Sequence, residues 1–245
     1  MARVDDLLTA ALIGVGDKPE DTAGREEKKR YSELISAAAA LAVAEELRHR
    51  GLREARPAPP GVLDASGAER RMSGGIGAKK VDVTWATEES GLILGISIKS
   101  INFRDARTRN FQKNLVNRRG DMLFEGVTLH RRFPYAVLGG LFFLDAGAEH
   151  DCTSRRRSTF LNAHSRLRLF TGRNDPGGRD EQYEHLYIIL LDASSAHANF
   201  RVFRVGEVDQ EVALNRVVDD LLQATAVRNP DFYEYQDSRL RPLPT

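Results

Sequence analysis

Hydrophobic and polar residues alternate along this chain with two different periods, which predict an ordered series of helices and strands. Residues 25–50 are rich in Ala, Leu, Glu and Lys and contain neither Gly nor Pro before Gly51, so they predict a long helix. Elsewhere, apolar residues at helical spacing predict helices, and short runs rich in Val, Ile, Leu and Phe predict strands. The further helices are expected over residues 108–132, 156–170 and 208–227, and the strands over residues 81–87, 92–101, 135–144, 186–192 and 200–205.

The order of these elements indicates the fold class. Only the turn-like residues 88–91 separate the first two strands, so we expect those strands to pair as a β-hairpin. The alternation of helices and strands along the chain predicts an α/β protein with a central mixed β-sheet flanked by α-helices. The predicted single domain covers residues 1–245 and comprises an N-terminal helical segment (1–50), a Pro- and Gly-rich loop (51–79), a core (about 80–205) and a C-terminal helix (208–228).

Composition limits the class of protein. A hydrophobic fraction of 41% with 29% charged residues is typical of a globular chain and argues against disorder. Cys152 is the single cysteine, which excludes an intrachain disulfide framework and fits a reducing compartment. The longest apolar run, residues 34–47, is interrupted by Ser36, Glu45 and Glu46 and is shorter than the roughly 20 residues of a membrane span. We therefore expect a cytoplasmic protein with no membrane segment.

The net charge is close to zero, but the basic residues are unevenly distributed. The chain has 36 Lys and Arg against 35 Asp and Glu. Between residues 96 and 135, however, there are nine basic and three acidic residues, so 9 − 3 gives a local excess of six positive charges. Arg155, Arg156 and Arg157 form a second basic block. Such clusters are typical of surfaces that bind the phosphate backbone of nucleic acids.

Three residues on the predicted hairpin carry groups suited to phosphate chemistry. Ser97 and Lys99 are two positions apart on a strand, so both point to the same face, and the hairpin can bring Asp82 alongside them. An Asp carboxylate is a preferred ligand of Mg²⁺, and a nearby lysine can orient an attacking water and offset charge on a phosphate. A partly buried ion pair between Asp82 and Lys99 with a purely structural role is the simpler alternative.

This arrangement resembles the active site of the PD-(D/E)XK nucleases, in which an Asp on one strand is followed by Glu-x-Lys on the next. Asp82 matches the Asp and Lys99 matches the Lys, while Ser97 stands at the position of the second acid. The resemblance covers about residues 30–145. It implies a restriction-endonuclease-like fold and an endonuclease that uses Mg²⁺, or Mn²⁺ in its place, to hydrolyse DNA phosphodiester bonds in restriction or phage defence.

The resemblance also implies where the metal ion and the partners would bind. Members of this family hold the metal with the motif Asp, a main-chain carbonyl and a further acid, which here correspond to Asp82, the carbonyl of Ile98 and a carboxylate recruited from elsewhere. Glu33 on the first long helix is our candidate for that carboxylate, with Glu45 and Glu46 as reserves. Because cutting both strands of DNA requires two active sites, we expect a homodimer or a partner subunit.

The predicted helix after Lys99 carries a polar stripe at spacings of three and four residues, formed by Asn114, Asn117, Arg118, Asp121 and Glu125. The resemblance implies that Asn117 and Arg118 assist catalysis by holding a phosphate or the metal-binding carboxylate. Arginine suits this role because its planar fork binds two phosphate oxygens at once. We expect contacts to DNA from Lys79, Lys80, Arg104, Asn114, Asn117, Arg119, Arg155, Arg156 and Arg157.

Other functions remain open at this point. Because Ser97 replaces an acid, the chain could be a catalytically weakened nuclease fold that serves as a DNA-binding or assembly module. A metal-dependent phosphoesterase acting on small nucleotides would use the same residues. The six histidines lack the HExxH and HxxxH spacings of zinc hydrolases, and Ser97 lacks the flanking glycines of a nucleophile elbow.

Overall fold

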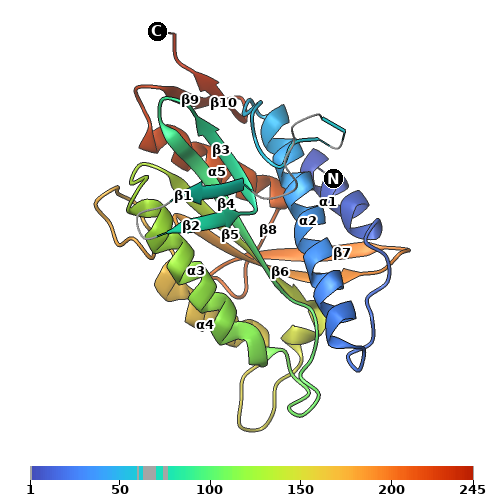
Figure 1. The fold of residues 1–245 in the computed structure, drawn as a ribbon. Coiled ribbons are helices and arrows are strands. Elements are labelled where there is room, and N and C mark those ends of the chain that lie inside the picture. Colours follow the sequence, from blue (N-terminus) through green and yellow to red (C-terminus); the bar gives the residue numbers. More distant parts are fainter. Residues whose placement is uncertain (1, 60, 63–69, 74–76, 245) are drawn as a thin grey trace.

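The computed structural model describes residues 2–59, 61–62, 70–73 and 77–244. Its centre is a mixed sheet of six strands that lies between helices (Figure 1). The strands stand in chain order across the sheet, with β4, β5 and β6 parallel and the outer neighbours antiparallel. They are β3 (Val83–Thr87), β4 (Gly91–Ile101), β5 (Val137–Asp145), β6 (His185–Ala193), β7 (Ala198–Arg204) and β8 (Glu211–Val212).

The five α-helices of the described residues cover the two faces of this sheet. One layer contains α1 (Arg3–Ile13), α2 (Arg25–His49) and α5 (Leu214–Arg228), and the other contains α3 (Leu115–His130) and α4 (Thr159–Leu167) (Figure 1). Each layer has its own buried apolar cluster against the sheet. None of the helices in the described part of the chain combines the length and apolarity needed to cross a membrane.

Alternation along β4 decides which layer each side chain meets. Ile96 and Ile98 are buried in the cluster that contains α2. Because successive side chains of a strand point to opposite faces, Ser97 and Lys99 point toward the α3 layer. The predicted functional side chains of β4 therefore lie on the face of the sheet opposite α2.

The α/β class with a mixed sheet flanked by helices is confirmed, and most predicted elements are present. Three helices begin later than their apolar spacing predicted. The helix expected from residue 108 begins at Leu115, after a 3₁₀ turn over Gln112–Asn114. The helix expected from residue 156 begins at Thr159, because the hydroxyl of Ser158 accepts a hydrogen bond from the N–H of Leu161 and caps it. The helix expected from residue 208 begins at Leu214, because Glu211–Val212 pair with β7 as strand β8.

The prediction of an irregular loop over residues 51–79 is wrong in part. Strands β1 (Arg70–Ser73) and β2 (Ala78–Val81) pair antiparallel and form a small hairpin next to the main sheet. Residues 60, 63–69 and 74–76 of the predicted loop lie outside the described residues. Gly and Pro residues predict turns and loops, and this signal does not exclude short strands between them.

The polar C-terminal tail also contains a hairpin, formed by β9 (Tyr233–Gln236) and β10 (Arg239–Pro242). Leu240 is buried in the α2 layer, and its N–H donates a hydrogen bond of 3.0 Å to the carbonyl of Arg50. Gly51 follows with φ of +112°, and a Cβ there would collide with the carbonyl of Leu240. Glycine is therefore required where α2 ends and the C-terminal hairpin docks.

Close packing between β5 and the α3 layer makes Gly140 a sensitive position. A Cβ at Gly140 would meet Leu186 Cδ2 and would lie 2.8 Å from Met122 Cε. We expect Gly140→Ala to lower the free energy of unfolding by about 1–3 kcal/mol, because the methyl group overpacks the core.

Gly120, on the exposed side of α3, provides the matched control because a Cβ there would meet nothing within 4 Å. The same change at Gly120 should raise the free energy of unfolding by about 0.5–1 kcal/mol, since alanine favours the helix. Urea unfolding followed by circular dichroism measures both values. Equal effects of the two substitutions would contradict the packing described around Gly140.

Candidate active site

The antiparallel pairing of β3 with β4 brings Asp82 next to Lys99. Asp82 forms the bend between β2 and β3, and Val83 pairs with Ile96. The carboxylate Oδ2 of Asp82 accepts a hydrogen bond of 2.6 Å from the N–H of Ile98 and lies 3.7 Å from Lys99 Nζ. The side chains of Asp82 and Lys99 are each 14% exposed, so both can be reached from solvent.

A second carboxylate, that of Glu125 on α3, completes this group. Lys99 Nζ donates a hydrogen bond of 3.2 Å to Glu125 Oε2. Glu125 is 3% exposed and is therefore more buried than Asp82, the other acid next to Lys99. Lys99 therefore lies between two carboxylates, and these three side chains with Ser97 form the candidate active site.

The sequence placed Glu125 in the polar stripe of its helix but not in the site. Its position seven residues after Arg118, about two helical turns, puts the two side chains on the same face of α3. This spacing is the signal that could have identified it. Spacing alone does not show which face of the helix is turned toward Lys99, because that depends on the packing of α3 on the sheet.

The structure does not place Glu33 in the candidate active site. Glu33 is on α2, across the sheet from Ser97 and Lys99, and its side chain is 67% exposed with Lys29 Nζ at 3.9 Å. The reserve candidates are also on α2, where Glu45 pairs with Arg3 and Arg48 and Glu46 pairs with Arg3 and Arg50. Strand alternation separates all three acids of α2 from the side chain of Lys99.

Burial and mutual charge control the ionisation of the site. Burial raises the pKa of Glu125, the Lys99 ammonium counteracts this, and the carboxylate of Asp82 raises it further. Burial alone would lower the pKa of Lys99, but the carboxylates of Glu125 and Asp82 outweigh it, so that pKa is raised. Lys99 is therefore an ammonium ion at neutral pH and acts as a hydrogen-bond donor rather than as a base.

Ser97 lies on the inner side of the site. Its hydroxyl is near Glu125 and Tyr183 and favours the ionised form of each, although burial keeps the pKa of both groups raised. The Tyr183 hydroxyl donates a hydrogen bond of 3.0 Å to the carbonyl of Met122 on α3. Ser97 Oγ is buried and has no hydrogen-bond partner of good geometry among the described residues. A buried hydroxyl in this state has the capacity to bind a further group at the site.

Arg118 is the one predicted helper on α3 whose charge is shown to act on the site. It lowers the pKa of Lys99, which places the guanidinium within electrostatic reach of the ammonium group. Its side chain is 39% exposed, with Nη1 at 3.7 Å from Asp121 Oδ2. Asn114 and Asn117 are exposed, just before and in the first turn of α3. These side chains can be reached from solvent.

The other basic residues expected to contact DNA lie at different places. Lys79 Nζ is 4.4 Å from the ring centroid of Phe124 on α3, and the guanidinium of Arg119 is 5.8 Å from the ring of Phe170. Lys80 is exposed on β2, beside Lys79. Lys79 therefore lies against α3, and Arg119 is part of α3, the helix that carries Glu125 and Arg118.

A more distant set of arginines lies in two loops. Arg104 is exposed after β4, where its guanidinium is 5.3 Å from the ring of Phe111. Arg155 and Arg157 are exposed before α4, and Arg156 is half-buried because its Nη2 donates to the carbonyl of Asp151 at 3.1 Å. The guanidinium groups of Arg104 and Arg156 thus make contacts within their own loops, with Phe111 and with the carbonyl of Asp151.

The two carboxylates of the site determine which metal ion it could hold. Among the described residues, no group of three or more His, Cys, Asp and Glu side chains is arranged to bind a metal ion. Asp82 and Glu125 nevertheless fit Mg²⁺, which takes one or two carboxylates and completes its shell with water and substrate phosphate. The contact of Ile98 with Asp82 is made by its N–H, so the predicted ligand role of its carbonyl stays a prediction.

The site thus combines two carboxylates, an ammonium group, a hydroxyl without a well-directed partner in the described part of the chain, and a partly exposed arginine. Such a set can bind a hard cation together with an anionic substrate. Comparisons with protein-family models, with curated proteins and with solved structures find no match to this chain.

Proposed function

We propose that this protein is a metal-dependent endonuclease that hydrolyses DNA phosphodiester bonds and belongs with the PD-(D/E)XK nucleases. The observation that carries the proposal is the placement of Lys99 Nζ between Glu125 Oε2 at 3.2 Å and Asp82 Oδ2 at 3.7 Å. An ion pair with only a structural role needs one acid, and a second buried carboxylate adds a desolvation cost. Two acids at one lysine are better explained by a site that binds a cation.

Each side chain has a distinct role in the proposed reaction. Asp82 and Glu125 would hold Mg²⁺ or Mn²⁺, with the carbonyl of Ile98 as a further ligand. When bound, the cation supplies a polarised water and neutralises charge on the phosphate. Lys99, being protonated, donates hydrogen bonds to the attacking water and to the phosphate oxygens. Ser97, whose buried hydroxyl has no well-directed partner among the described residues, would offer that hydroxyl to the substrate or to a bound water.

The surroundings of the site support an extended polyanion as substrate. Arg118 is partly exposed within electrostatic reach of Lys99 and can bind a phosphate through two N–H groups, with Asn117 one residue before it. Lys79, Lys80 and Arg119 add positive charge along α3. A small nucleotide would not need charges spread along a helix. This distribution favours DNA over the phosphoesterase alternative, and a role in restriction or phage defence is proposed with it.

Cleavage of supercoiled plasmid DNA tests the proposed function. We expect nicked and then linear plasmid in the presence of Mg²⁺ or Mn²⁺, and no product with EDTA. Linear product should need two protein copies, so its appearance should rise more steeply with protein concentration than nicking does. Divalent-independent cleavage, or none in any divalent ion, would contradict the proposal.

The second candidate function, a DNA-binding or assembly module without turnover, is favoured by one observation. Ser97 stands where a second acid of the motif is expected, and a hydroxyl is a weaker metal ligand than a carboxylate. This candidate predicts DNA binding that weakens steeply with salt, together with intact plasmid under every divalent ion.

A further inference from the structure

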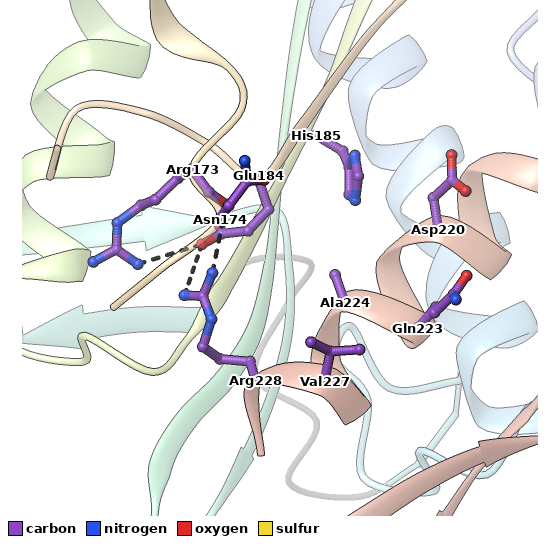
Figure 2. A pocket seen from close by; sticks show the side chains of 9 residues that line it. All are labelled: Arg173, Asn174, Glu184, His185, Asp220, Gln223, Ala224, Val227 and Arg228. Carbon is purple, nitrogen blue, oxygen red and sulfur yellow. Dashed lines mark hydrogen bonds and ion pairs between the residues drawn. The ribbon is translucent and has the colours of Figure 1, made fainter. Parts of the chain in front are cut away.

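A pocket separate from the candidate active site opens between the start of β6 and the second half of α5. Its volume is about 250 Å³, and none of its lining residues belongs to the group around Lys99. Figure 2 shows two arginines turned toward one glutamate on one side, with a histidine, an aspartate and a glutamine on the other side. The lining residues are Arg173, Asn174, Glu184, His185, Asp220, Gln223, Ala224, Val227 and Arg228.

One wall of the pocket contains more buried positive than negative charge. Glu184 Oε1 lies 3.3 Å from Arg173 Nη1 and 3.0 Å from Arg228 Nη1, so two guanidinium groups share one carboxylate oxygen (Figure 2). The side chains of Arg173 and Arg228 are 0% and 7% exposed. The other oxygen of Glu184 accepts from the N–H of Leu138 at 2.7 Å and lies 3.5 Å from His130 Nε2. One carboxylate therefore compensates two permanent cations.

The buried arginines also have unused hydrogen-bond donors. Arg173 Nε and Arg228 Nη1 are buried and have no hydrogen-bond partner of good geometry among the described residues. The contact of Arg228 with Glu184 is thus an ion pair without a well-directed hydrogen bond. Because a buried donor without an acceptor is costly, these groups favour an acceptor that enters from the pocket.

The acid on the opposite wall does not cancel this excess. Asp220 accepts a hydrogen bond of 2.6 Å from the Tyr187 hydroxyl, and its carboxylate pairs with Arg204 and with Arg216, the latter at 2.8 Å. The lining itself contains two arginines and two acids, and Asp220 is already neutralised by Arg204 and Arg216 outside the lining, with Arg204 also 4.0 Å from Glu207. Burial lowers the pKa of His185, so this ring is a neutral donor or acceptor near pH 7.

We propose that this pocket binds a small phosphate-bearing molecule. Arg228 lines the pocket with an Nη1 donor that lacks a well-directed acceptor among the described residues, while its Nη2 donates to the carbonyl of Arg173 at 3.4 Å. The amides of Asn174 and Gln223 are further donors at the rim. Ala224 and Val227 give the pocket an apolar floor that suits the carbon skeleton of a phosphate monoester. A purely structural network would require no open volume beside its unpaired donors.

Titration with inorganic phosphate and with AMP, followed by thermal unfolding in a phosphate-free buffer with EDTA, tests the proposal. We expect both ligands to raise the unfolding temperature of the wild-type protein in a saturable way. Tighter binding of AMP would identify a phosphate monoester as the occupant, and equal binding would identify phosphate itself. The absence of any rise at millimolar ligand would overturn the proposal.

Two variants locate the binding site without disturbing the buried arginines. Gln223→Glu adds a negative charge at the rim and should weaken phosphate binding by about fivefold or more. Gln210→Glu makes the same change at an exposed position that does not line the pocket, and it should bind as the wild type does. Equal affinities of these two variants would overturn the proposal.

A third variant separates this pocket from the proposed nuclease function. Lys99→Ala removes the central cation of the candidate active site and should leave phosphate binding unchanged. If Lys99→Ala abolishes binding instead, the phosphate binds at the candidate active site and the pocket proposal fails. Nuclease activity does not enter this comparison, so failure of the nuclease proposal would leave the result interpretable.

Discussion

Replacing Lys99 by methionine is expected to lower the rate of divalent-dependent plasmid cleavage by about a hundredfold to a thousandfold. The methionine has a similar length but offers no donor to the attacking water or the phosphate, and loss of one such donor at a reacting oxyanion typically has this effect. The measurement is the single-turnover rate of nicking with Mg²⁺ and again with Mn²⁺. Asp82→Asn should reduce the rate at least as strongly, because it removes a proposed metal ligand.

The matched control for this substitution is Lys29→Met on α2. Lys29 also lies near a carboxylate, with its Nζ 3.9 Å from Glu33, but it is exposed and on the other side of the sheet. This variant should cleave at the wild-type rate. Because Lys99→Met leaves Asp82 and Glu125 without their cation, its unfolding temperature must be measured as well. Cleavage at the wild-type rate by folded Lys99→Met would remove this site from the mechanism.

Glu125→Gln is expected to abolish divalent-dependent cleavage, whereas Glu33→Gln should leave it unchanged. Glu125 accepts a hydrogen bond from Lys99 inside the site, while Glu33 is exposed on the opposite layer. Isothermal titration with Mn²⁺ should show weaker binding to Glu125→Gln, since an amide is a poorer ligand than a carboxylate. The reverse result, with Glu33 essential and Glu125 dispensable, would show that α2 supplies the acid.

The pH dependence of cleavage provides an independent check on Glu125. Burial raises the pKa of this carboxyl above its ordinary value of 4.5, and a protonated carboxyl does not hold a cation. As the pH falls, metal-dependent cleavage should therefore decline at a pH above 4.5. The protein should stay folded over the pH range in which cleavage declines. Burial raises the pKa of Glu125, so protonation of this carboxyl does not destabilise the folded state. An acid limb that coincides with unfolding would contradict this assignment.

The local part of the candidate site could be predicted from residue order alone. The period of two along β4 placed Ser97 and Lys99 on one face, and the short turn before β4 required β3 to return alongside it with Asp82 at its start. These relations hold because strand alternation and hairpin pairing are local properties of the chain. The mixed sheet flanked by helices also followed from the order of the elements.

The acid that joins Asp82 and Lys99 could be identified only from the packing of the helices on the sheet. Glu33 and Glu125 are both helical carboxylates in the sequence, and their helical pattern does not reveal which side of the sheet each helix covers. Packing of apolar side chains places α2 against Ile96 and Ile98 and places α3 on the other face, which turns Glu125 toward Lys99. The same long-range packing places Arg228 of α5 next to Glu184, the residue just before β6. This contact forms one wall of the pocket proposed to bind phosphate.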